Sequence, residues 1–157
     1  MEKPCILFLE DDHALNASKT AQFIASGLEV ISCHRIDQAI EKFEKYKDKI
    51  KCIVTDLNMR SFGLKDYAQD QDIPTLSGWI WLYRYILSDA PNIQVVVFSD
   101  FIEDLETRIE KTSDEEEKLA FASSRIRLVK KGDFFQHGHI DICRIVNEIL
   151  AQPQLGC

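Results

Sequence analysis

Hydrophobic residues along the chain fall into five short runs, each followed by a stretch with helical spacing. The runs are apolar on both faces, which is typical of strands buried in a parallel sheet. We predict strands over Cys5–Leu9, Leu28–Cys33, Ile50–Thr55, Ile93–Phe98 and Ile126–Val129. We predict helices over His13–Ser26, Ile36–Tyr46, Thr75–Leu87, Ile102–Ser123 and Ile140–Ala151.

Alternating strands and helices predict an α/β fold of the flavodoxin-like (βα)5 type. The sheet is doubly wound and parallel, with strand order 2-1-3-4-5. Residues 1–152 are expected to form one domain and residues 153–157 a C-terminal tail. The fourth helical stretch is long, and Thr112-Ser113-Asp114 followed by three glutamates is typical of a helix start. Two helical pieces or a bent helix are expected there.

Composition narrows the possible functions. The 157 residues carry a net charge of −7, which argues against a nucleic-acid or membrane-surface binder because phosphate contacts need a basic face. The chain has no long apolar run and no signal-like start, so a cytoplasmic protein is expected. Its five cysteines form no C-x-x-C pair, and most are expected to be buried structural thiols.

Polar residues stand where four of the predicted strands end. The carboxyl ends of parallel strands share one edge of the sheet, where open α/β sheets place their ligand sites. Clustered carboxylates are hard oxygen ligands for Mg²⁺. A carboxylate nucleophile, a divalent cation, a hydroxyl and a lysine are what phosphoryl transfer to an aspartate requires. The residues concerned are Glu10, Asp11, Asp56, Ser99 and Lys130.

Each of these residues also has an ordinary structural interpretation. Asp56 could cap the following loop, and Glu10 and Asp11 could form a solvated turn. Ser99 could be the N-cap of the next helix, and Lys130 an ordinary surface lysine. The convergence of all of them on one predicted edge favours the functional interpretation.

Four stretches make the chain resemble the receiver domain of two-component response regulators. They are ILFLEDDHALN, IVTDLNM, VVVFS and RLVKKGDF, and TLSGWIWLYRYI is similar to the third helix of that family, which opens with glycine. The resemblance extends in order over nearly the whole chain.

The resemblance implies a role for each site residue. Asp56 would be phosphorylated by a histidine kinase or a phosphotransfer protein, and Asp56, Asp11 and the backbone carbonyl of Asn58 would bind Mg²⁺. Glu10 would assist through a water. Ser99 would hydrogen-bond the phosphoryl group, and Lys130 would pair with its charge.

Three positions depart from the family pattern. Lys131 stands where the family has proline after its lysine, and Arg127 stands at the position of the family's switch aromatic. Asp100 stands where a small residue is common, and its charge would oppose a phosphoryl group.

Two segments are longer than the pattern needs. The loop Arg60–Pro74 is predicted to overhang the site as a lid or partner-docking loop, with a tolerated surface insertion as the alternative. The stretch Glu103–Ser123 adds acidic residues that could alter which partner fits, with a solvated helix face as the alternative.

The leading functional hypothesis is a stand-alone phosphoacceptor receiver that signals to a downstream protein by contact and is not a turnover enzyme. A second hypothesis is a receiver-like docking module that works without phosphorylation. A third, a haloacid-dehalogenase-like phosphatase, requires its aspartate nucleophile at the first strand with another Asp two residues later. The sequence Glu10-Asp11-Asp12 does not provide that setting.

Overall fold

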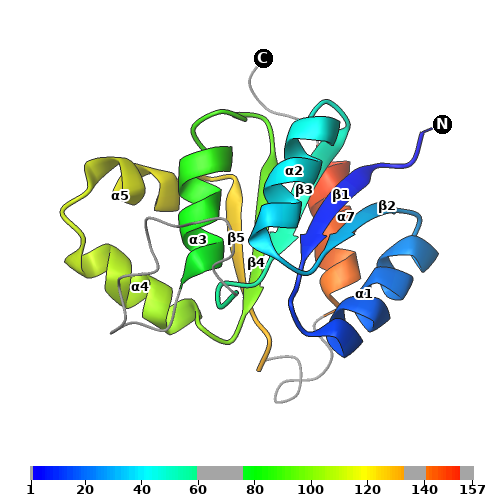
Figure 1. The fold of residues 1–157 in the computed structure, drawn as a ribbon, viewed down its shortest axis with the longest axis horizontal. Helices are drawn as coiled ribbons and strands as arrows, with labels where there is room; N and C mark the ends of the chain where they lie inside the picture. The colour runs from blue at the N-terminus through cyan, green and yellow to red at the C-terminus, as the bar shows by residue number, and fades with distance from the viewer. Residues whose placement is uncertain (1, 60–75, 133–140, 153–157) are drawn as a thin grey trace.

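Five parallel strands form the centre of the protein (Figure 1). The computed structural model describes residues 2–59, 76–132 and 141–152, so the loop Arg60–Pro74 and the tail 153–157 lie outside the described residues. The sheet order is β2-β1-β3-β4-β5, which confirms the predicted order. The strands are β1 (Cys5–Leu9), β2 (Glu29–Cys33), β3 (Ile50–Thr55), β4 (Gln94–Ser99) and β5 (Ile126–Lys130).

Helices cover both faces of this sheet. They are α1 (His13–Ala25), α2 (Ile36–Tyr46), α3 (Ser77–Trp81), α4 (Ile102–Lys111), α5 (Glu115–Phe121) and α7 (Ile142–Ala151). The end of α3 widens into a π-helix, η2 (Leu82–Ile86), where the sequence pattern predicts an ordinary helix. Hydrophobic spacing cannot distinguish the two forms, because one π turn shifts the apolar stripe only slightly.

Two hydrophobic layers hold helices and sheet together. Phe23 of α1 and Val146 of α7 pack with Phe8 and Val54 on one face of the sheet. On the other face, α2, α3 and α4 pack on a larger layer that contains both tryptophans. The central strands are buried on both faces, which explains why their sequences are continuous apolar runs.

The helix ends follow the sequence signals. Asp12 accepts a hydrogen bond from the amide of Leu15 at 3.0 Å and caps α1. Gly27, just beyond α1, has φ = 100°, a left-handed conformation that glycine adopts without strain. Asp114 accepts hydrogen bonds from the amides of Glu116 and Glu117, so the predicted helix restart is confirmed.

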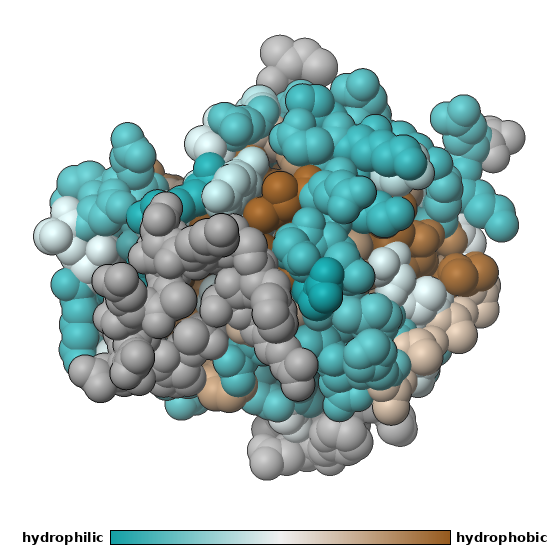
Figure 2. Space-filling model, viewed as in Figure 1, coloured by the Kyte–Doolittle hydropathy of each residue, from teal (hydrophilic) through white to brown (hydrophobic). Residues whose placement is uncertain are grey.

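The surface and the thiols also agree with the composition. Hydrophilic residues cover most of the described surface on the face drawn in Figure 2. No helix in the described ranges is both long and apolar enough to cross a membrane. Cys5, Cys33, Cys52 and Cys143 are buried free thiols, and burial raises the pKa of Cys33 and Cys52 to about 12.

A buried carboxylate fixes helix α5 to its neighbours. The side chain of Glu117, 1% exposed, accepts hydrogen bonds from the indole of Trp79 at 3.0 Å and from Nε of Arg108 at 2.6 Å. The hydroxyl of Thr112 donates to the second carboxylate oxygen at 3.2 Å. A buried carboxylate is tolerated when donors surround it in this way.

Removal of this carboxylate is expected to destabilise the fold. Glu117→Ala leaves the indole of Trp79 and the guanidinium of Arg108 without their acceptor, and we expect a loss of about 3 kcal/mol in the free energy of unfolding. The matched control is Glu115→Ala, in the same helix with a side chain 79% exposed, expected to change stability by less than about 0.5 kcal/mol. Urea unfolding measures both, and equal effects would contradict the structural role of Glu117.

Candidate functional site

The ends of three strands bring polar side chains together at one edge of the sheet. Glu10 follows β1, Asp56 follows β3, and Ser99 closes β4. All three are buried, with exposed fractions of 1%, 8% and 0%. Buried polar groups need hydrogen-bond or ion-pair partners. Here Lys131 pairs with both Glu10 and Asp56, and Ser99 donates a hydrogen bond to Asp56.

The carboxylate of Asp56 is surrounded by donors. Its Oδ1 accepts hydrogen bonds from the amides of Leu57 at 2.6 Å and Asn58 at 3.4 Å, and from the hydroxyl of Ser99 at 2.6 Å. Its Oδ2 pairs with Nζ of Lys131 at 2.6 Å. Ser99 Oγ also accepts from the amide of Phe101, so the serine contacts the carboxylate and opens the turn before α4.

The lysine in the site is Lys131, where the sequence pattern and the resemblance led us to expect Lys130. Nζ of Lys131 pairs with both Asp56 and Glu10, whereas Nζ of Lys130 pairs with Glu103 of α4 at 2.7 Å. Side chains alternate along a strand, and Lys130 follows Leu128 onto the α4 face of β5. Lys131 lies beyond the strand, in a turn whose amide donates to the carbonyl of Ser99.

Glu10 and Lys131 shift each other's protonation. Burial raises the pKa of the Glu10 carboxyl to about 7, although the hydrogen bond from Lys131 opposes the rise. Burial alone would lower the pKa of the Lys131 ammonium, but the charges and hydrogen bonds of Asp56 and Glu10 outweigh it and raise that pKa. The cluster therefore contains more negative charge than one lysine neutralises.

Three carboxylates of the cluster are close enough to share one metal ion. Glu10, Asp11 and Asp56 each offer an oxygen, and these atoms all lie within 4.8 Å of one another. Octahedral Mg²⁺ spaces neighbouring ligand oxygens by about 3 Å and opposite ones by about 4 Å. With all three carboxylates ionised, the cluster and the ammonium of Lys131 carry a net charge of −2, which a divalent cation would balance. The donor set therefore fits Mg²⁺.

The remaining residues named from the sequence lie around this cluster. Asn58 is half-buried in the loop whose amides bond Asp56. Asp100 is exposed, and its Oδ1 would lie 3.8 Å from a Cβ atom added to Gly132. Arg127 is exposed on β5.

Sequence reasoning did not single out Asn16, which holds the end of β1 in place. Its Nδ2 donates to the carbonyls of Glu10 and Cys33, each at 3.1 Å, from a position in α1 that is 2% exposed. The buried residues of α1 are Asn16, Lys19 and Phe23, so two of the three are polar and apolar spacing gave no signal for this face. The contacts of Asn16 position the backbone that carries Glu10.

Helix α3 approaches the backbone of Asp56 so closely that its second residue must be glycine. A Cβ on Gly78 would lie 2.0 Å from the carbonyl oxygen of Asp56. The amide of Gly78 donates to the carbonyl of Leu57 at 3.0 Å, and the hydroxyl of Ser77 bonds the backbone of Met59. The start of α3 and the loop after Asp56 are therefore joined by direct contacts.

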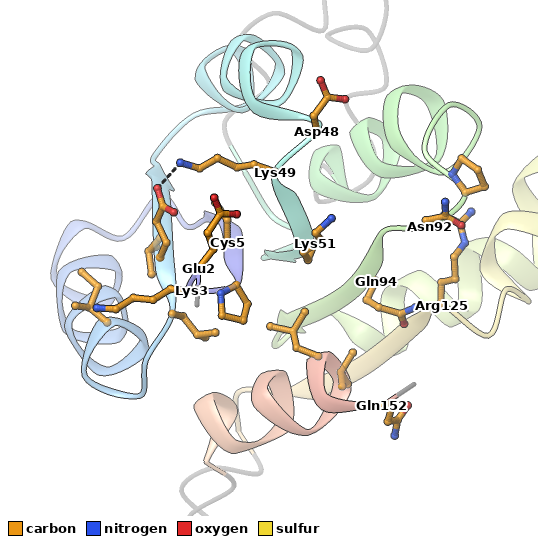
Figure 3. Close-up of a pocket in the computed structure, with 18 of the residues that line it drawn as sticks. Glu2, Lys3, Cys5, Asp48, Lys49, Lys51, Asn92, Gln94, Arg125 and Gln152 are labelled. Carbon is orange, nitrogen blue, oxygen red and sulfur yellow. Dashed lines mark hydrogen bonds and ion pairs between the residues drawn. The ribbon is translucent and has the colours of Figure 1, made fainter. Parts of the chain in front are cut away.

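A hollow in the described surface lies at the other end of the sheet (Figure 3). It has a volume of about 1390 Å³ and begins where the strands begin, at Cys5 and Gln94. Part of its charged lining is engaged elsewhere, because Lys49 pairs with Glu29 and Arg125 donates to the carbonyls of Leu87 and Ala90. We assign it no function.

Solved structures of receiver domains share this fold. A response regulator receiver domain protein from Clostridium thermocellum has a TM-score of 0.62 and 16% identity, with 93% of each chain covered. The non-phosphorylated HemR receiver domain from Leptospira biflexa has a TM-score of 0.62 and 13% identity, covering 99% of this chain and 100% of that one. A response regulator from Thermotoga maritima has a TM-score of 0.61 and 14% identity, covering 96% and 100%.

The fold is therefore that of response regulator receiver domains, over most of the chain. The resemblance seen in the sequence is confirmed at the level of the fold. No protein-family model matches the sequence, and the comparison with curated proteins finds no match.

The close approach at Gly78 can be tested by adding one methyl group. Gly78→Ala forces α3 away from Asp56, and we expect a loss of about 2 kcal/mol or more in unfolding free energy despite the better helix propensity of alanine. Gly132→Ala is the control, because its nearest atom would be at 3.8 Å, and it should change stability by less than about 1 kcal/mol. Thermal and urea unfolding of both variants decide the point.

Proposed function

We propose that this chain is a receiver domain of a two-component or phosphorelay pathway that accepts a phosphoryl group on Asp56. The observation that carries the proposal is the arrangement around that carboxylate. The hydroxyl of Ser99 and the ammonium of Lys131 both lie 2.6 Å from its oxygens, and the carboxylates of Glu10 and Asp11 lie beside it. The proposal includes a cytoplasmic location and residues 1–152 as one functional domain.

The arrangement suits in-line phosphoryl transfer. An oxygen of Asp56 attacks the phosphorus of a phosphohistidine in a histidine kinase or phosphotransfer protein, the P–O bond forms, and the P–N bond to the donor breaks. Lys131 pairs with the charge of the transferred group, and Ser99 donates its hydroxyl to a phosphoryl oxygen. Both groups already contact Asp56, so they need to move little.

Mg²⁺ fits the same site through Glu10, Asp11 and Asp56, with the Asn58 carbonyl as a further ligand by family resemblance. When bound, it would neutralise charge on the phosphoryl oxygens and orient them. The chain's own contribution is to hold the carboxylates together through the backbone contacts of β1 and β3. Hydrolysis of the acyl phosphate in the same site would reset the protein, which makes it a signalling module and not a turnover enzyme.

A second function, a docking module that works without phosphorylation, is favoured by one observation. Lys131 bridges Glu10 and Asp56, which closes the site with an internal ion pair. If that pair is permanent, a phosphodonor cannot reach Asp56. The experiment below separates the two functions.

Phosphorylation can be tested directly. Incubation with Mg²⁺ and acetyl phosphate should add one acid-labile phosphoryl group per chain, seen by intact mass. Asp56→Asn and omission of Mg²⁺ should each abolish the addition, because the first removes the nucleophile and the second removes the charge neutralisation. An unmodified native protein under these conditions, together with no response to beryllofluoride, would support the docking module instead.

The assignment of the lysine is a separate prediction. Lys131→Met should slow phosphorylation by acetyl phosphate about 100-fold, the usual effect of removing one group that stabilises developing charge. Lys130→Met is the matched control and should stay within about fivefold of the native rate, because its pair with Glu103 is exposed. If Lys130→Met slowed phosphorylation more than Lys131→Met, the lysine that pairs with the phosphoryl group would be Lys130.

A further inference from the structure

Helix α5 lies beside α3 and away from the sheet, joined to the rest of the fold through α4 and η2 (Figure 1). Its deepest polar contact is the hydrogen bond from the indole of Trp79 to the carboxylate of Glu117. Trp79 is fully buried, and its ring also packs edge-on against Phe121 at a centroid distance of 6.0 Å. Trp79 is therefore in direct contact with two residues of α5, Glu117 and Phe121.

Trp79 is in turn attached to the loop after Asp56 through the residues that precede it in α3. It stands directly after Gly78, whose amide bonds the carbonyl of Leu57 and whose Cα faces the Asp56 carbonyl with no room for a methyl group. Ser77, one residue earlier, bonds both the amide and the carbonyl of Met59. A displacement of residues 57–59 cannot leave Trp79 where it is.

Glu117 also joins α5 to α4. Nε of Arg108 and the hydroxyl of Thr112, at the C-terminal end of α4, both donate to its carboxylate. The four side chains Trp79, Glu117, Arg108 and Thr112 thus join α3, α4 and α5 through one buried acceptor. We call α4 and α5 together, residues 102–121, the α4–α5 unit.

We propose that the hydrogen bond from Trp79 to Glu117 couples the loop after Asp56 to the α4–α5 unit, so that loading of Asp56 changes the conformation of that unit. This inference rests on the proposed phosphoacceptor function. Trp79 and Glu117 are positioning residues, because neither touches Asp56 itself. Packed side chains and hydrogen bonds carry such coupling when they belong to an element with two conformations whose equilibrium both sites bias.

The contacts that the structure describes at the end of β5 lead to α4. Arg127 is exposed, and Leu128 packs with the apolar layer beneath α4. Lys130 pairs with Glu103 at the N-terminal end of α4, whereas Thr112 lies at the C-terminal end of that helix. Among the described residues, the hydrogen bonds to Glu117 come from Trp79 in α3 and from Arg108 and Thr112 at the end of α4, and Trp79 is the one of these that stands beside the loop after Asp56.

Trp79→Phe tests the coupling, and Trp81→Phe is its matched control. Phenylalanine keeps an aromatic ring at residue 79 but removes the N–H that bonds Glu117. Trp81 lies two residues later in the same helix and is equally buried, and its indole nitrogen has no hydrogen-bond partner among the described residues. The two variants remove the same atoms, and only the first loses the contact.

The readout is the backbone amide shifts of the ¹⁵N-labelled full chain with Mg²⁺, before and after addition of beryllofluoride. In the native protein we expect shifts at Leu57 and Ser99, which report loading, and at Ala120 and Phe121 in α5. Trp79→Phe should keep the first pair of shifts and reduce the second to less than half. Trp81→Phe should keep both pairs.

The outcomes separate this inference from the proposed function. Shifts at Leu57 and Ser99 without shifts in α5 of the native protein, or a full α5 response in Trp79→Phe, would overturn the coupling and leave phosphorylation intact. No shift at Leu57 and Ser99 would overturn the proposed function and the coupling with it. If Trp79→Phe does not fold, Glu117→Met, which keeps the length of the side chain but removes the acceptor of the indole N–H, should show the same selective loss in α5.

Discussion

Carboxylates gathered at one end of a parallel sheet need a cation, and the rest of the site depends on how Lys131 meets that need. The fold brings Glu10, Asp11 and Asp56 together because β1 and β3 are adjacent and end at the same edge. Lys131 reaches over from the turn after β5 and pairs with two of the three. Burial is the main cause of the raised pKa of Glu10, and the charge of Asp56 adds to it, whereas the hydrogen bond and charge of Lys131 oppose the rise.

The position of Lys131 also connects several strands at the site. Its amide bonds the carbonyl of Ser99, so the turn that carries it is attached to β4, while its ammonium holds β1 and β3 from the far side. Ser99 itself shares its hydroxyl between Asp56 and the turn before α4. A charge change at Asp56 therefore alters contacts on three strands at once.

The loop after Asp56 extends this connection in another direction. Gly78 allows α3 to touch the backbone of Asp56, and Trp79 joins that helix to the buried carboxylate of Glu117. A helix inserted between α4 and β5 would ordinarily be free to vary as a surface feature. Here it is attached to the element that contacts the proposed phosphoacceptor, which gives the extra sequence a defined place in the structure.

Much of this was readable from the sequence, because the signals involved are local. Continuous apolar runs identified the central strands, Asp12 and Asp114 marked helix starts, and polar residues after the strands located the edge that carries Asp56 and Ser99. Each signal depends on a few neighbouring residues and on the shared direction of parallel strands. The fold class, the strand order and most of the cluster follow from them.

Tertiary structure decided what adjacent residues with similar chemistry do. Lys130 and Lys131 are the same residue type. Lys130 is the last residue of β5 and pairs with Glu103, whereas Lys131 lies in the turn beyond the strand and pairs with Asp56. Trp79 and Trp81 are both buried, yet only Trp79 meets an acceptor, because Glu117 reaches it from a helix 38 residues away in sequence. The sequence alone determined which residues could form the site, and long-range packing chose among them, because side-chain partners across the sheet depend on strand ends and turns that no local pattern specifies.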